Sequence, residues 1–145
     1  MQSFKHTIHI QRSPAQVWAF MMDFSTAPRW RTHVREMRIL TDGPLRVGTE
    51  LQITLDLSGR IRTARCEVCA FETARRFGVR STTKKATGTF EYLFAPDEGG
   101  TLVTFKCDLR PHGVMWLLVP LMIRTNRERF AGHLSNLKRE VERAA

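Results

Sequence analysis

The order of hydrophobic patterns along the chain predicts an α+β protein with seven strands and a long C-terminal helix. One alternating segment opens the chain, two short helical segments follow it, and six further alternating segments come next at intervals of about ten residues. An apolar stripe with helical spacing then closes the chain. Short turns at residues 58–59 and 96–100 indicate antiparallel hairpins of the strands that they join.

The length and composition of the chain are typical of one globular domain. It has 145 residues, of which 42% are hydrophobic, so it is long enough to bury a sizeable core. We therefore expect a single domain over residues 1–145. The longest apolar run, residues 114–123, is shorter than the roughly 20 residues that span a membrane, and residues 1–11 do not resemble a signal peptide. We expect a cytoplasmic protein with reduced thiols, because three cysteines are too few for a disulfide framework.

The first strand and the two short helices have clear boundary signals. Apolar and polar residues alternate over residues 4–10, which indicates a half-buried strand. Ser13 followed by Pro14 is the pattern of a helix N-cap with proline in the first turn. Pro28 starts a second short helical segment that ends near Trp30.

Six strands are expected between these helices and the C-terminal helix. The clearest alternation lies in residues 50–57, where leucine and isoleucine occupy every second position. Glycine, proline or paired lysines occur in four of the five turns between these strands. The expected strands cover residues 33–40, 50–57, 61–71, 76–82, 87–95 and 101–110.

A long helix is predicted for residues 114–143. Its first half is apolar on all sides, so we expect it to be covered on more than one side. Pro120 either kinks this helix or marks its true start. The apolar stripe consists of Ile123, Phe130, Leu134, Leu137 and Val141.

The chain is strongly basic, with 23 Lys+Arg against 14 Asp+Glu and a formal net charge of +9. A nucleic-acid-binding protein uses such charge to neutralise phosphates, but no helix-turn-helix, zinc-finger or RNP-type motif accompanies the arginines. We interpret most arginines as exposed residues on strand faces. A basic surface module for nucleic acid or for an anionic membrane is therefore the least favoured function, although peripheral contact with a membrane stays compatible with the charge.

No metal or cofactor site is expected. Cys66 and Cys69 are three residues apart on a strand, so their side chains face opposite sides of the sheet and do not share a metal or a disulfide. His6 and His9 are also three residues apart on a strand, so their side chains face opposite sides of the sheet and do not share a metal. Nothing in the sequence selects a catalytic nucleophile, and neither a phosphate-binding loop nor a dinucleotide fingerprint occurs.

Short motifs are spread along the whole chain. They are Ser-Pro-Ala-Gln-Val-Trp at residues 13–18, Asp23, Pro28-x-Trp30, Val-Gly-Thr at residues 47–49, Gly100-Thr101 and Leu-Lys-x-x-Val-Glu at residues 137–142. In this order they resemble the START/SRPBCC superfamily, in particular its polyketide cyclase/dehydrase and lipid transport branch. The resemblance implies a helix-grip fold, in which a curved, antiparallel seven-stranded sheet wraps around the long C-terminal helix. It also implies a cavity for a hydrophobic ligand between sheet and helix.

Candidate cavity residues follow from the alternation of the strands and from the helix stripe, with ordinary core packing as the alternative for each. They are Trp30, Ile53, Leu55, Cys66, Val68, Phe77, Val79, Phe90, Tyr92, Phe105, Leu118, Met122, Arg127 and Phe130. The hydroxyl of Tyr92 would need a partner in an apolar cavity, such as a ligand carbonyl. Arg127 lies on the apolar helix stripe and would hold an acidic group of the ligand. The alternative is that its long side chain extends out of the stripe and places the guanidinium in solvent. Trp30 resembles a tryptophan beside the cavity mouth in this family.

We expect the chain to bind a hydrophobic or aromatic small molecule, lipid-like or polyketide-like, in this cavity. A polyketide cyclase or dehydratase that uses the same cavity is the alternative, in which polar groups polarise a carbonyl or move a proton. The candidate residues include few titratable side chains, which favours binding over catalysis. Neither the ligand nor the oligomeric state follows from the sequence.

Overall fold

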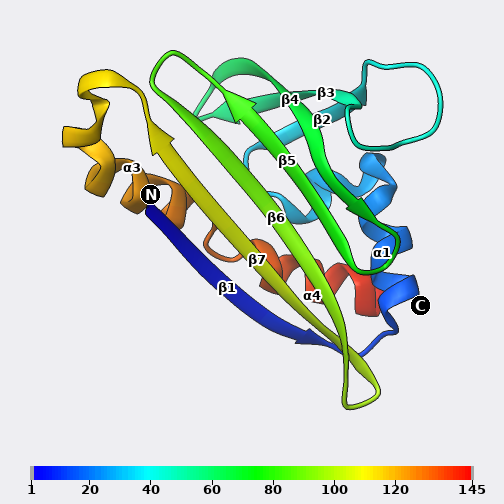
Figure 1. Ribbon diagram of the computed structural model, residues 1–145. Coiled ribbons are helices and arrows are strands. Elements are labelled where there is room, and N and C mark those ends of the chain that lie inside the picture. The colour runs from blue at the N-terminus through cyan, green and yellow to red at the C-terminus, as the bar shows by residue number, and fades with distance from the viewer. Residues whose placement is uncertain (1, 145) are drawn as a thin grey trace.

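The chain folds into a curved antiparallel sheet whose concave face is covered by helices (Figure 1). The computed structural model describes residues 2–144, without the side chains of residues 2 and 129. Its strands are β1 (Gln2–Ile10), β2 (Val34–Ile39), β3 (Glu50–Leu57), β4 (Arg60–Glu72), β5 (Arg76–Thr82), β6 (Ala86–Asp97) and β7 (Gly100–Pro111). Its helices are α1 (Pro14–Met22), the 3₁₀ turn η1 (Phe24–Thr26), α2 (Ala27–Trp30), the 3₁₀ turn η2 (Gly113–Leu118), α3 (Val119–Phe130) and α4 (His133–Arg143).

The seven strands form one sheet in the order β1-β7-β6-β5-β4-β3-β2, and every neighbouring pair is antiparallel. With the short helices after β1 and the helical segment after β7, this confirms the predicted α+β class and the helix-grip arrangement. Among residues 2–144, no helix is both long enough and apolar enough to cross a membrane.

Helix α1 begins where the sequence predicts and closes one end of the core. The Gln16 N–H donates to Ser13 Oγ at 3.2 Å, and the Ser13 N–H donates to Gln16 Oε1 at 3.0 Å, which makes a reciprocal capping box. The helix then places Trp18 against the sheet. Its indole meets three phenylalanine rings edge-on, those of Phe71, Phe77 and Phe94.

A β-bulge in β4 changes which residues face the core. Cys66 and Val68 face inward and are buried. The register with β5 shifts between Val68 and Ala70, so Cys69 is an extra residue and Phe71 returns to the inner face. Cys66 and Cys69 therefore lie on opposite faces of the strand, as predicted, and Cys69 is only half-buried.

The C-terminal helical segment crosses the concave face, but it is not the single helix predicted for residues 114–143. It consists of η2, α3 and α4, and the chain turns between α3 and α4 at Gly132. Gly132 has a φ of 84°, a left-handed conformation that glycine adopts readily and that interrupts an α-helix. Pro120 lies in the first turn of α3, so it marks a helix start and not a kink. The buried part of the stripe lies on α4, at Leu134, Leu137 and Val141.

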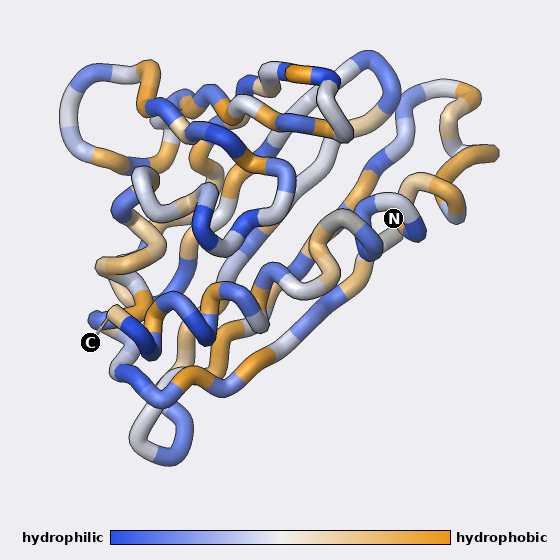
Figure 2. The backbone as a smooth tube through the Cα atoms, turned by 180° about the vertical axis from the view of Figure 1, so that it is seen from behind, coloured by the Kyte–Doolittle hydropathy of each residue, from blue (hydrophilic) through white to orange (hydrophobic). Residues whose placement is uncertain are grey.

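The beginning of this helical segment is exposed, which corrects the expectation that it is covered on more than one side. The reason is its position, because η2 follows the end of β7 and projects from the body of the molecule (Figure 2). The exposed side chains are those of Val114, Trp116, Leu117, Leu118 and Leu121.

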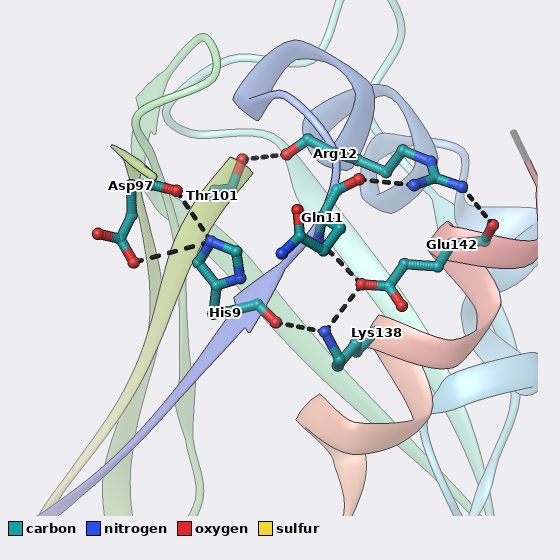
Figure 3. A network of polar contacts seen from close by, with 7 residues as sticks. All are labelled: His9, Gln11, Arg12, Asp97, Thr101, Lys138 and Glu142. Carbon is teal, nitrogen blue, oxygen red and sulfur yellow. Dashed lines mark hydrogen bonds and ion pairs between the residues drawn. The ribbon is translucent and has the colours of Figure 1, made fainter. Parts of the chain in front are cut away.

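A polar network fastens α4 to the end of β1 (Figure 3). The Glu142 carboxylate accepts hydrogen bonds from Lys138 Nζ at 2.8 Å and from the Gln11 N–H at 2.9 Å. Lys138 also donates to the His9 carbonyl at 2.8 Å, and the Arg12 guanidinium donates to the Glu142 carbonyl at 2.6 Å. The bond from Lys138, followed by that from the Gln11 N–H, holds the pKa of Glu142 below its ordinary value.

Glu142→Gln is expected to lower the free energy of unfolding by about 1 kcal/mol at neutral pH, because an amide replaces a carboxylate that pairs with a lysine. The folded pKa of Glu142 lies below the unfolded value, so the advantage of wild type is present above the unfolded pKa and is lost as the pH falls through the folded pKa. Urea unfolding over the acidic range measures the difference. Glu36→Gln, at an exposed carboxylate of β2, is the control, and an equal loss in both variants would contradict the prediction.

Candidate functional site

A cavity of about 370 Å³ lies between the concave face of the sheet and α3. Strands β2 to β7 form one wall, and α3 with the first residue of α4 forms the opposite wall. Arg31 and Thr32, between α2 and β2, complete the lining. The described lining residues are Arg31, Thr32, Val34, Ile53, Leu55, Ala64, Cys66, Val79, Ser81, Thr83, Lys85, Ala86, Gly88, Phe90, Leu109, Met122, Asn126, Phe130 and His133.

The cavity lies where the inward-facing residues of β4, β5 and β6 are small. These residues are Ala64, Ser81, Ala86 and Gly88. At the other end of the sheet, large rings fill the inner face around Trp18. A Cβ on Gly88 would come within 3.0 Å of the Phe90 ring, so glycine at this position leaves the space that the ring occupies. Side-chain size therefore decides which half of the concave face is filled and which is open.

An aromatic layer, formed by Trp30, Tyr92 and Phe105, separates the cavity from the closed core. The Tyr92 ring lies 4.9 Å from the Phe105 ring and 5.9 Å from the Trp30 ring, measured between centroids. Each of the three residues is 2% exposed. Phe130, which lines the cavity, lies directly on this layer at 4.9 Å from Phe105.

The structure brings half of the predicted site residues to the cavity and places the others elsewhere. Those at the cavity are Ile53, Leu55, Cys66, Val79, Phe90, Met122 and Phe130. The aromatic layer takes Trp30, Tyr92 and Phe105, and the packed core takes Val68 and Phe77. These five do not line the cavity as predicted. For the four strand residues the reason is that alternation identifies the face of a strand but not the position along it. Trp30, at the end of α2, packs on the Tyr92 ring instead.

Two predicted residues of the helical segment also lie away from the cavity. Leu118 belongs to η2 and is exposed, since this turn projects beyond the sheet. Arg127 is exposed, and its guanidinium lies over the Phe4 ring at 5.8 Å from the centroid. The long apolar part of the Arg127 side chain lets the guanidinium lie outside the apolar helix stripe. Arg127 therefore does not line the cavity as predicted.

Arg31 brings a positive charge to the cavity wall. It is only 9% exposed, and its guanidinium stacks on the Trp30 ring at 4.6 Å and on the Tyr92 ring at 5.4 Å. Within the described part of the chain, its Nε has no hydrogen-bond partner and no aspartate or glutamate lines the cavity. A buried guanidinium without a carboxylate is costly, and an anion in the cavity would offset that cost.

His133 lies beside Arg31 at the same wall. It is 3% exposed, its ring packs against Trp30 and Phe130, and neither ring nitrogen has a hydrogen-bond partner among the described residues. Burial lowers the pKa of His133 to about 4, and the charge of Arg31 acts in the same direction. The Thr32 backbone lies close enough to raise the pKa of His133 slightly, although the contact does not have the geometry of a hydrogen bond. The imidazole is therefore neutral at neutral pH, with one donor and one acceptor available to a ligand.

The sequence-based candidates omit seven polar lining residues: Arg31, Thr32, Ser81, Thr83, Lys85, Asn126 and His133. Arginine is rarely buried, so nothing in the local pattern distinguishes Arg31 from the exposed arginines around it. Asn126 had a signal, because it lies four residues from both Met122 and Phe130 and therefore on the same helix face. Its Nδ2 donates to the Met122 carbonyl at 2.9 Å.

Comparisons with known proteins agree with this architecture. A family model described as polyketide cyclase/dehydrase and lipid transport matches residues 1–142. Among solved structures, a protein from Thermus thermophilus shares 16% identity at a TM-score of 0.79, with 99% of each chain covered. A START superfamily protein from Mycobacterium smegmatis shares 14% at 0.78, again with 99% of each chain covered. The Zhui aromatase/cyclase from a Streptomyces species shares 16% at 0.74, covering 98% of this chain and 94% of that one. At these identities the likeness shows a shared fold, and no curated protein matches the chain.

The three thiols are expected to react at different rates. Burial raises the pKa of Cys66 to about 11 and that of Cys107 to about 12, and both side chains are buried, whereas Cys69 is half-buried. We expect Cys69 to be alkylated at least about tenfold faster than the other two, since access and thiolate fraction both set the rate. Timed alkylation followed by peptide mass spectrometry measures this. Cys69→Ala should remove the fast phase, and early labelling of Cys66 would refute the assignment.

His133 is expected to make the protein less stable in mild acid. Its folded pKa of about 4 lies below the ordinary value of 6.5, so its contribution to stability is complete above pH 6.5 and is lost as the pH falls through 4. The loss amounts to roughly 2–4 kcal/mol, and His133→Gln should remove this pH dependence. Urea unfolding of both proteins from neutral to acidic pH measures the difference. An NMR titration that gives this ring an ordinary pKa would contradict the prediction.

Proposed function

The chain belongs to the polyketide cyclase/dehydrase and lipid transport family, and from this premise we propose that it binds a hydrophobic small molecule that carries an anionic group. The apolar part of the ligand occupies the cavity between the sheet and α3, and the anionic group pairs with Arg31. A volume of about 370 Å³ lies within the range of small-molecule sites, about 300–1,000 Å³.

The buried guanidinium of Arg31 is the observation that carries this proposal. Its stacking on the aromatic layer fixes the position of the charge, while its Nε has no partner among the described residues. A carboxylate, phenolate or phosphate would accept charge-assisted hydrogen bonds from it. The neighbouring neutral imidazole of His133 supplies one further donor for the same ligand group.

The geometry supports binding better than catalysis. Family and fold fit either hydrophobic ligand binding or an activity of the polyketide cyclase type. A cyclase that moves protons works best with a base whose pKa is near the operating pH. His133 lines the cavity, but a pKa of about 4 makes it a weak base at neutral pH.

Two fluorescent probes of nearly equal shape test the charge preference. Anilinonaphthalene sulfonate is anionic, and N-phenylnaphthylamine has the same aromatic groups without the sulfonate. Wild type should bind both, and Arg31→Met should weaken the anionic probe by about tenfold to hundredfold through the loss of a charge-assisted hydrogen bond. The neutral probe should change by less than about twofold, because the apolar walls are intact.

Three further measurements make this test specific. Arg29→Met removes an exposed charge two residues away and should change neither affinity by much. Ala64→Phe narrows the cavity and should weaken both probes, which locates them there and not on the surface. Thermal melts should show Arg31→Met to be at least as stable as wild type, because an unpaired buried charge is gone. Absence of binding by wild type would end the proposal, and equal effects of Arg29→Met and Arg31→Met would end its anionic part.

A further inference from the structure

An apolar turn projects from the end of the molecule at which β7 ends (Figures 1 and 2). Successive residues of a 3₁₀ turn point about 120° apart, so the exposed side chains point in several directions and do not form one flat face. Trp116 is 63% exposed, whereas Trp18 and Trp30 are buried. The apolar turn consists of Val114, Trp116, Leu117, Leu118 and Leu121.

Basic residues lie on both sides of the apolar turn. Arg110 precedes it and Arg124 follows it, and both are exposed. The β5–β6 turn adds Lys84 and Lys85, also exposed, and the His112 N–H donates to the Lys85 carbonyl at 2.9 Å. That bond places the two lysines beside the start of η2.

This end of the molecule is free of acidic residues over long stretches of sequence. Residues 73–90, which include the two lysines, contain no aspartate or glutamate, and neither do residues 109–127, which include the apolar turn. Glu128 is the next acidic residue along α3, where it pairs with Arg124 at 3.3 Å. Of the four basic residues, only Arg124 pairs with a carboxylate among the described residues, so most of the positive charge around the apolar turn is uncompensated.

The cavity opens at the same end. Lys85 is exposed and also lines the cavity, so solvent reaches the cavity beside the β5–β6 turn. Met122, one residue beyond the apolar turn, lines the cavity from the opposite wall. The apolar turn and the two lysines thus lie at the mouth of the cavity.

We propose that this end of the protein docks on an anionic lipid bilayer, with the apolar turn inserted in the interface. Tryptophan and leucine at its tip enter the boundary between headgroups and acyl chains, and the flanking lysines and arginines meet the lipid phosphates. A folded protein partner fits less well, because lysine is depleted at protein interfaces and the apolar side chains point in several directions. This docking is independent of the proposed ligand, and it would bring the cavity mouth to the membrane surface.

Co-sedimentation with lipid vesicles tests the proposal. Wild type should bind vesicles of phosphatidylcholine mixed with phosphatidylglycerol, bind pure phosphatidylcholine much less, and lose affinity as salt is added. Replacing Trp116 and Leu117 together by serine should lower the partition coefficient by about tenfold or more. Replacing Lys84 and Lys85 by alanine should lower it by about fivefold per lysine on anionic vesicles only. Val47→Ser, at an apolar residue exposed elsewhere, should have no effect.

Two further measurements decide between membrane docking and the alternatives. Brominated lipids should quench the fluorescence of wild type but not of Trp116→Phe, because the other two tryptophans are buried. Arg31→Met should bind vesicles like wild type, so loss of the cavity ligand and loss of docking are distinguishable. Light scattering without lipid should show the same oligomeric state for wild type and the double serine variant. Absence of vesicle binding, or a dimer that this variant dissociates, would overturn the proposal.

Discussion

Both the stability of the core and the existence of the site depend on the aromatic layer of Trp30, Tyr92 and Phe105. On one side of this layer the rings around Trp18 pack against the concave face, and on the other side small residues leave the cavity open. The same rings hold the guanidinium of Arg31, which lies over two of them. A charge that would be costly against aliphatic side chains is thereby retained at the cavity wall by ring faces.

The contacts that fasten α4 to β1 differ from those that shape the outer wall of the cavity. Helix α4 is fastened to β1 through Glu142 and Lys138, at the end of the molecule opposite the cavity mouth. Helix α3 forms the outer wall of the cavity, and the left-handed Gly132 lies between the two helices. The polar network therefore fixes α4, whose first residue His133 lines the cavity, through hydrogen bonds that do not involve α3.

Alternation and turn chemistry were sufficient to predict the seven strands, the cap at Ser13 and the face of the sheet on which each candidate strand residue lies. They could not predict how far along a strand the cavity extends, and for this reason Phe77 and Val68 were assigned to it although they are packed. The sequence pattern does not predict the burial of Arg31, because this burial depends on the Tyr92 ring, which comes from the distant strand β6. The apolar composition of η2 predicts side chains that other elements cover. These side chains are exposed because η2 lies beyond the end of the sheet, and composition does not show where the sheet ends.

The extra residue at the β4 bulge reverses the numbering parity of the inner face, which is even up to Val68 and odd at Phe71. Loss of residue 69 or 70 would remove the bulge and leave a regular strand in which the side chains of Val68 and Phe71 still face inward. A deletion elsewhere in β4 would instead turn the side chains on one side of the deletion to the opposite face of the sheet. The bulge separates the part of β4 that lines the cavity from the part that packs on Trp18. A one-residue deletion at the bulge would therefore keep the inner face of β4 the same both in the part that lines the cavity and in the part that packs on Trp18. Each part of the strand can thus change in sequence without turning the side chains of the other part.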